Sequence, residues 1–284
     1  MTANQNLAKI GFSFANTDGE LCFPSNWVRN DLINLTIPDE AELVTQSLSQ
    51  KYPIGTQLRR AGNLYRYSKA GETMGTGRQG FLKCNKLVSP ESAAAGGNWL
   101  TLLATAGVAG DTTLDLADTN TRAANFYESA IMWIQNDTDK VMDQYTIIAS
   151  DAGNGTHNYI YIAPPGLKRA CGIVSATTGA CQIYVNPYSS VGSMLDHATG
   201  FFSAIGMAHF PITTAYYFWL HTAGFEFGTG ATPDLGGTAY RRDAYSNVDG
   251  SIGGYTAGYQ RIGYVLPVTT ASVFESFIML QLDQ

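Results

Sequence analysis

Short runs of β-branched and aromatic residues, each bounded by turn-forming residues, constrain the fold of this chain most. Turn clusters such as Asp151-Ala-Gly-Asn-Gly155 and a glycine-rich stretch at 224–263 separate the runs. Such residues favour strands, and short strands with frequent turns are typical of sandwiches and barrels rather than βαβ units. We therefore expect a mainly β protein with β-sandwich-like or barrel-like modules. The runs lie at residues 64–68, 131–134, 144–148, 159–162, 182–185, 216–220 and 262–266.

One short helix is expected shortly after residue 36. Thr36 is a suitable N-cap, and Pro38 suits the first turn of a helix. The pair Tyr52-Pro53 then ends the pattern. The helix would place three apolar side chains at helical spacing, namely Leu43, Val44 and Leu48.

Composition divides the chain into three segments. Residues 1–50 have little periodicity before the helix and are expected to form an extended N-terminal arm. Residues 51–195 hold most of the strand-like runs and are expected to form the main β domain. Residues 196–284 are rich in glycine and are expected to form a C-terminal β module.

The charge balance disfavours two classes of partner. The net charge is −6, whereas a protein that binds a nucleic-acid backbone normally needs a basic surface. No apolar run approaches the roughly 18 residues of a membrane span. The polar N-terminus also lacks the order of a signal peptide. We therefore expect no direct nucleic-acid or membrane partner, and synthesis in the cytoplasm.

The charges are segregated along the chain. Eight basic residues and one acid lie between Lys51 and Lys86, whereas seven basic and fifteen acidic residues follow from Gly96 onward. The basic block is either a solvated face formed by chance or a docking face for an acidic partner. Phosphate is a third option, although no phosphate-binding motif accompanies the block.

The four cysteines, Cys22, Cys84, Cys171 and Cys181, form no C-x-x-C pair, so a zinc site of that type is not indicated. A disulfide between Cys171 and Cys181 is conceivable, since the segment between them could fold back as a hairpin. Because no secretory signal is present, free and buried thiols are the expectation.

Motifs for catalysis are scarce. The histidines His157, His197, His209 and His221 have no metal-binding spacing, and His221 is expected to be a hydrogen-bonded core or edge residue. No activated-serine or nucleotide-binding motif occurs. Carboxylates near loops leave a β-fold glycosidase as a weaker alternative; the candidates are Asp111, Asp115 and Glu128. We expect no catalytic residue, no cofactor and no metal site.

Several strings, taken in order, resemble virion structural proteins of tailed bacteriophages over roughly residues 52–283. They are Tyr52-Pro-Ile-Gly-Thr56, Leu64-Tyr-Arg-Tyr-Ser-Lys-Ala-Gly71, Tyr145-Thr-Ile-Ile148, Asn186-Pro-Tyr188, Tyr217-Phe-Trp-Leu-His-Thr-Ala-Gly224, Gly263-Tyr264 and Leu280-Gln-Leu-Asp283.

The resemblance is to capsid cement or decoration proteins. It implies a β-rich body bound to the outside of the phage head, often as a homotrimer, that bridges neighbouring major capsid subunits and stabilises the shell. It also implies a non-enzymatic protein located on the virion surface and made in the host bacterial cytoplasm.

Two groups of residues are candidate partner contacts. Aromatic side chains of the arm would anchor on a neighbouring subunit or, alternatively, pack on the protein's own core; they are Phe12, Phe14, Phe23 and Trp27. Basic side chains of the block at 51–86 would meet acidic capsid loops or an acidic protomer, led by Arg59, Arg60 and Arg66.

A different virion module, in the tail or the fibre base, is the main alternative. Such a module could contact glycans through exposed aromatic side chains; the candidates are Tyr240, Tyr245, Tyr255, Tyr259 and Tyr264. The low content of charged residues, 14 %, is consistent with either kind of assembly, since interface cores are depleted in charge.

Overall fold

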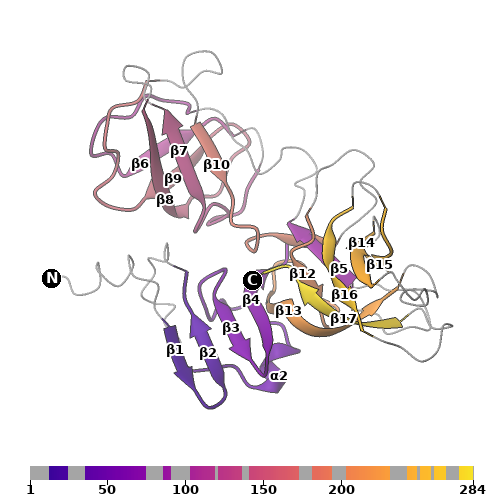
Figure 1. The fold of residues 1–284 in the computed structure, drawn as a ribbon. Helices are drawn as coiled ribbons and strands as arrows, with labels where there is room; N and C mark the ends of the chain where they lie inside the picture. The colour runs from indigo at the N-terminus through magenta and orange to yellow at the C-terminus, as the bar shows by residue number, and fades with distance from the viewer. Residues whose placement is uncertain are drawn as a thin grey trace. The chain divides into compact units, whose positions relative to one another are not determined.

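A computed structural model describes most of the chain: residues 13–24, 36–74, 86–90, 103–118, 121–135, 141–172, 181–193, 203–230, 242–247, 250–256, 259–266 and 275–283. Within these ranges the protein is mainly β, with two sheets of antiparallel strands and one short helix (Figure 1). The expected mainly β class is therefore confirmed.

The chain forms two compact units, which differ from the expected segments. Unit 1 comprises residues 1–11, 24–31 and 92–189, and unit 2 comprises residues 12–23, 32–91 and 190–284. Residues 51–91 therefore group with the C-terminal part of the chain instead of with residues 92–195. The reason is pairing between strands more than 140 residues apart, Tyr217 opposite Lys69 for example, which no local sequence pattern reports.

Unit 1 contains a five-stranded antiparallel sheet in the order β10-β7-β8-β9-β6 (Figure 1). Alternate side chains on each strand point into one core, as Met132 and Ile134 do on β7 and Ile160 and Ile162 do on β9. The strands are β6 (Thr113–Leu116), β7 (Ile131–Gln135), β8 (Met142–Ser150), β9 (Asn158–Ile162) and β10 (Cys181–Tyr184).

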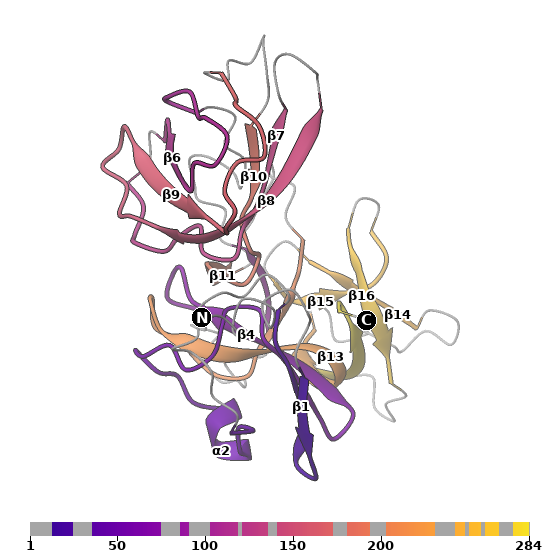
Figure 2. The same cartoon turned by 90° about the vertical axis from the view of Figure 1, so that its left-hand side faces the viewer.

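Unit 2 contains a twelve-stranded sheet whose main path is β1-β2-β3-β4-β13-β17-β16-β14-β15, with β5, β11 and β12 joined beside it (Figure 2). The strands that precede β13 are β1 (Ser13–Asn16), β2 (Gly19–Cys22), β3 (Gln57–Arg60), β4 (Asn63–Lys69), β5 (Lys86–Pro90), β11 (Val191–Ser193) and β12 (Gly206–Ala208). The others are β13 (Tyr217–Thr229), β14 (Asp243–Ser246), β15 (Ile252–Gly253), β16 (Arg261–Val265) and β17 (Glu275–Gln281).

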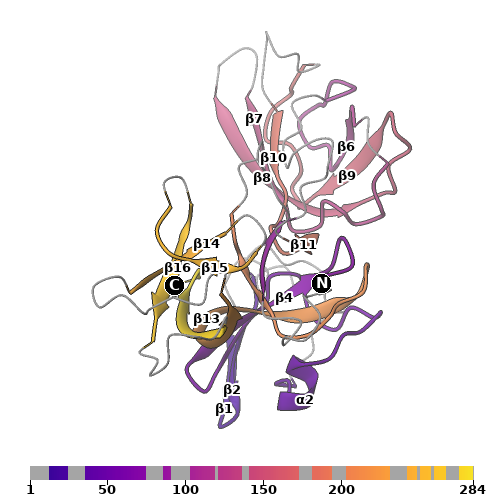
Figure 3. The ribbon, with the colours of Figure 1, turned by 90° about the vertical axis from the view of Figure 1, so that its right-hand side faces the viewer.

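The long strand β13 lies between β4, from the N-terminal part of the chain, and β17, from its C-terminal part; β13 and β4 can be followed in Figure 3. Its first half pairs with β4, and its second half pairs with β17. A register shift lies between His221 and Ala223, and Gly224 follows with a φ of +115°. A Cβ atom at Gly224 would lie 2.2 Å from Asn63 Oδ1, so glycine is needed where the bulged strand passes the β3–β4 turn.

A cluster of aromatic rings stabilises the β4–β13 pair. The ring centroids of Tyr52 and Trp219 are 5.1 Å apart, and Tyr67 packs on both rings. Tyr52 and Trp219 are almost fully buried. The Tyr52 hydroxyl donates to the carbonyl of Thr36 at 2.7 Å, which satisfies its polar atom.

Helix α2 (Glu40–Leu43), the one helix among the described residues, is shorter than expected and has a different cap. The Asp39 carboxylate, instead of Thr36, accepts from the backbone N–H of Glu42 at 2.8 Å. Leu43 is buried, but Val44 and Leu48 are exposed, so the predicted apolar face extends no further. Ser47 instead bridges to Tyr217 of β13, which replaces helical pairing with sheet pairing.

Near the start of the N-terminal arm, residues 13–22 form a β-hairpin. Strands β1 and β2 pair with each other, and β2 continues the sheet by pairing with β3. The backbone N–H of Asp18 donates to Asn16 Oδ1 at 2.7 Å and closes the turn between them. Residues 13–22 therefore form the edge of the unit 2 sheet.

The thiols of Cys171 and Cys181 are free and buried, as the sequence predicts. Burial, with a contribution from Cys171, raises the pKa of the Cys181 thiol to about 12. Cys22 is free and half-buried, whereas Cys84 lies outside the described residues.

Candidate functional site

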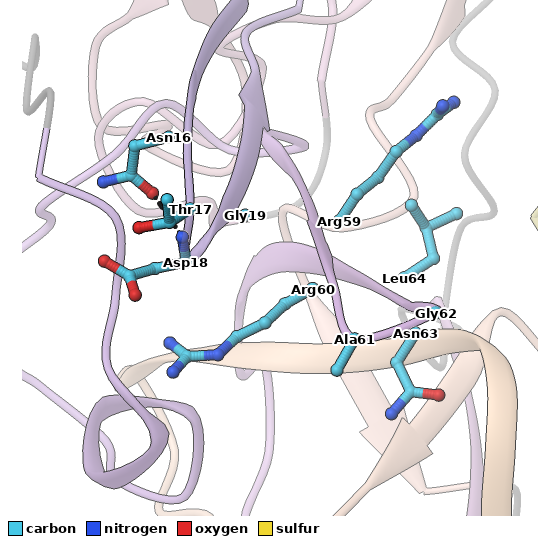
Figure 4. A pocket seen from close by; sticks show the side chains of 10 residues that line it. All are labelled: Asn16, Thr17, Asp18, Gly19, Arg59, Arg60, Ala61, Gly62, Asn63 and Leu64. Carbon is cyan, nitrogen blue, oxygen red and sulfur yellow. Dashed lines mark hydrogen bonds between the residues drawn. The ribbon is translucent and has the colours of Figure 1, made fainter.

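An open groove lies between the β1–β2 turn and the β3–β4 turn of unit 2 (Figure 4). Two neighbouring residues of β3, Arg59 and Arg60, point to different sides of it. Arg60 donates to the carbonyl of Pro38 and lies 4.0 Å from the Glu40 carboxylate, whereas Arg59 is exposed. The groove therefore presents Arg59 to solvent and uses Arg60 to hold the segment before α2. Its lining is Asn16, Thr17, Asp18, Gly19, Arg59, Arg60, Ala61, Gly62, Asn63 and Leu64.

The structure separates the candidate aromatic contacts of the arm. Phe14 on β1 is half-buried, whereas Phe23 is 4 % exposed and belongs to the protein's own core. Burial removes Phe23 from the surface that a partner could reach. Phe12 and Trp27 lie outside the described residues.

Arg66, the third candidate basic contact, is engaged within unit 2. Its guanidinium donates to the Asp283 carboxylate and to the carbonyl of Gly55, the latter at 3.0 Å. These bonds tie β4 to the end of β17 and to the turn before β3. Among the three candidate arginines, Arg59 is therefore the most exposed to solvent and the most accessible to a partner.

The outer face of the unit 1 sheet carries exposed aromatic and apolar side chains along β7, β8, β9 and β10, and Asp115 of β6 lies beside them opposite Tyr159. Trp133 is 39 % exposed and pairs in register with Gln144, while Tyr184 pairs with Ile131. The described side chains that share this face on β7, β8, β9 and β10 are Ile131, Trp133, Gln135, Met142, Gln144, Thr146, Tyr159, Tyr161 and Tyr184. An exposed sheet face of this composition is a candidate protein interface.

Unit 2 has a smaller exposed aromatic strip where β13 pairs with β17. The rings of Phe225 and Phe277 stack with centroids 5.4 Å apart, and Phe227 packs on Phe277 at 4.9 Å. Phe225 and Phe277 are 52 % and 41 % exposed. The strip adds a second apolar surface to the molecule.

A buried cluster of His209, His221 and Glu226 was not predicted, since the sequence indicates isolated histidines. His221 is fully buried, as expected, and donates from Nε2 to the carbonyl of Ala223 at 2.8 Å. Its Nδ1 atom hydrogen-bonds Glu226 Oε2, and His209 Nε2 lies 2.6 Å from the same oxygen. The ligand atoms of the three residues lie within 4.8 Å of one another.

The bulge in β13 explains how the cluster forms. His221 and Glu226 are five residues apart, so in a regular strand they would point to opposite faces. The register shift between His221 and Ala223 adds one residue and brings both side chains to one face. His209 follows β12, whose Met207 lies opposite His221. In the sequence, the signal for this cluster is a histidine and a glutamate five residues apart with a glycine between them. This spacing indicates that both side chains share a face only when the bulge is known.

The Glu226 carboxyl group is held in its ionised form. Burial raises its pKa, but hydrogen bonds from His209 and His221 outweigh burial and lower the pKa to about 2. The remaining oxygen, Oε1, accepts from the backbone N–H of Phe227 at 2.8 Å. The cluster is therefore a carboxylate with two imidazoles directed at one oxygen.

The loop carboxylates considered for hydrolysis have local structural partners. Asp115 hydrogen-bonds His157 Nδ1 at 3.0 Å, and Asp111 accepts from the backbone N–H of Val108 at 2.8 Å. Glu128 is 5 % exposed. Each interaction fixes a loop or strand end of unit 1.

Comparison with models of known protein families, with curated proteins and with solved structures finds no match to this chain. Among the described residues, no helix has the length and apolar character that spanning a bilayer requires.

Proposed function

We propose that this protein is a non-enzymatic structural protein of a phage virion. It binds the outside of the head, bridges neighbouring major capsid subunits and stabilises the shell as cement. It acts as a homotrimer, so that several modest contacts act together on a repeating lattice. Its place is the capsid surface, after synthesis in the host cytoplasm.

The exposed aromatic and apolar side chains on the outer face of the unit 1 sheet are the observation that carries this proposal. Trp133, Met142, Tyr159 and Tyr184 are each 39–47 % exposed there. Leaving so much aromatic surface in water is unfavourable, and aromatic residues without charges are typical of interface cores. We assign this face to contact between copies of the chain.

The positions of the phage-like strings give further support. The strings at residues 64–71, 217–224 and 280–283 lie on β4, β13 and β17, which are neighbours in one sheet. Tyr52, from the first string, packs on Trp219 of β13. These strings therefore share one structural context, the centre of unit 2, whereas the strings at residues 145–148 and 186–188 lie in unit 1.

Arg59 supplies the polar part of the proposed docking. It is exposed at the rim of the groove in unit 2, and arginine pairs well with carboxylates. We assign this groove to acidic loops of the major capsid protein. A charge contact of this kind steers association and weakens as salt rises.

A module of the tail or fibre base that contacts glycans is the second candidate. One observation favours it: Tyr255 is 65 % exposed and packs edge-on against Tyr245, with ring centroids 5.4 Å apart. Tyr259 and Tyr264 are half-buried, and Tyr240 lies outside the described residues. Binding of the purified protein to a glycan array would favour this candidate.

The two candidates differ in where the protein is found in the virion. Virions are separated into heads and tails, and the copies of the chain in each fraction are counted by quantitative mass spectrometry. We expect many copies in the head fraction, in fixed proportion to the major capsid protein. Enrichment in the tail fraction would overturn the cement proposal.

A further inference from the structure

The buried cluster of His209, His221 and Glu226 is not used by the proposed docking function. Its three potential ligand atoms, His209 Nε2, His221 Nδ1 and Glu226 Oε2, lie within 4.8 Å of one another in unit 2. We propose that this cluster binds one divalent transition-metal ion, with zinc as the best match to the ligands.

The hydrogen bond of His221 to the backbone supports this assignment. A carbonyl oxygen only accepts, so the 2.8 Å contact between His221 Nε2 and Ala223 O fixes the proton on Nε2. Nδ1 is then the ring atom that faces Glu226 Oε2, and a cation between these two atoms would be bound by both.

The surrounding contacts have the arrangement of an outer ligand shell. A metal-bound histidine usually donates its other ring N–H to a carbonyl or carboxylate, as His221 does to Ala223. The second oxygen of Glu226 is held by the N–H of Phe227. Tyr65 stacks on the His221 ring at 4.8 Å, which fixes the plane of the imidazole.

The ligand types select the metal. Two imidazoles and one carboxylate suit zinc, copper and nickel, whereas magnesium and calcium prefer sets of oxygen atoms. Ligands about 2.0–2.1 Å from a tetrahedral zinc ion are roughly 3.3 Å apart. His209 Nε2 lies 2.6 Å from Glu226 Oε2, and His221 Nδ1 is also in hydrogen-bond contact with that oxygen, so both imidazoles must move away from the carboxylate to admit the ion. The His209 side chain is 26 % exposed, whereas His221 is fully buried.

The ion would fasten the segment after β12 to β13. His209 lies beyond the end of β12, while His221 and Glu226 flank the bulge of β13. A metal that binds only the folded protein stabilises it by mass action. Zinc is therefore expected to raise the melting temperature in proportion to the logarithm of its concentration.

The test uses untagged full-length protein that has been treated with a chelator and dialysed. Zinc chloride is titrated by calorimetry, and the metal retained after a second dialysis is measured by mass spectrometry. We expect one zinc ion per chain, tighter binding than for magnesium, and a higher melting temperature. His209→Gln should weaken zinc binding at least about tenfold, since it removes a ligand at the exposed side.

His157→Gln is the matched control, because His157 is also a partly exposed histidine paired with a carboxylate, Asp115. It should bind zinc as the unchanged protein does. If circular dichroism shows that His209→Gln is unfolded, Glu226→Gln takes its place with the same expectation. The proposal is overturned if the unchanged protein retains no zinc, or if the folded ligand variant binds zinc equally well.

Discussion

At the scale of single residues, a buried carboxylate in unit 1 shows how this protein uses its few charges. Asp118 is fully buried, and the Tyr127 hydroxyl donates to it at 2.7 Å. The Arg122 guanidinium lies 3.4 Å from the same carboxylate. Burial and the hydrogen bond to Asp118 raise the pKa of Tyr127, so the phenol remains protonated as a donor. The buried charge of Asp118 is therefore compensated by Tyr127 and Arg122 within the fold, and no substrate is needed to explain it.

Tyr127→Phe tests this interpretation. The substitution removes one donor from a buried carboxylate and changes little else, so we expect a loss of about 1–3 kcal/mol in the free energy of unfolding. The measurement is chemical denaturation followed by fluorescence.

Tyr161→Phe is the matched control, because its hydroxyl also donates to an aspartate, Asp151, at the protein surface. That variant should unfold at the same denaturant concentration as the unchanged protein. Equal losses in both variants would contradict a special role for the buried pair.

At the scale of elements, the β1–β2 hairpin is part of the sheet and determines how the arm can be tested. Leu21 on β2 is fully buried, and β2 pairs directly with β3. Deleting residues 1–30 therefore removes two strands together with Phe23 from the core.

We expect the deletion of residues 1–30 to lower the melting temperature of the protein strongly, since it exposes apolar core and the edge of β3. The measurement is differential scanning calorimetry. Deleting residues 1–11 keeps both strands and serves as the control. An unchanged melting temperature in the longer deletion would show that the hairpin contributes nothing to unit 2.

Local sequence patterns predict where the strands lie better than they predict how the strands pair. The runs around Ile131, Gln144 and Tyr159 become β7, β8 and β9, because alternating apolar side chains report a buried face directly. The helix cap is Asp39 instead of Thr36, because the helix begins at Glu40 and Asp39 is the capping residue directly before it. The pairing of β4 with β13 leaves no local signal, and the spacing of His221, Gly224 and Glu226 does not by itself indicate the bulge that brings His221 to Glu226.

At the scale of the whole molecule, a charge content of 14 % fits a subunit that covers part of its surface with other copies. We expect light scattering after size-exclusion chromatography to give a mass near three times 30.6 kDa. Trp133→Gln changes an exposed aromatic side chain on the outer face of the unit 1 sheet and should shift the protein toward monomer.

Phe225→Gln is the control for that measurement, because it changes an aromatic side chain of similar exposure on unit 2. It should leave the mass at the trimer value. A strict monomer at high concentration, or a trimer that Trp133→Gln does not weaken, would contradict the assignment of this face.

The central claim, attachment to the outside of the phage head, is tested most directly by occupancy. Purified protein is titrated onto expanded heads that lack it, and bound copies per head are counted by mass spectrometry and located by electron cryomicroscopy. We predict saturable binding at repeating sites on the outer surface, and weaker binding by Arg59→Glu at physiological salt. Lys168→Glu, a charge reversal on unit 1, is the control and should bind as the unchanged protein does. Heads that take up no protein at any concentration would contradict the account.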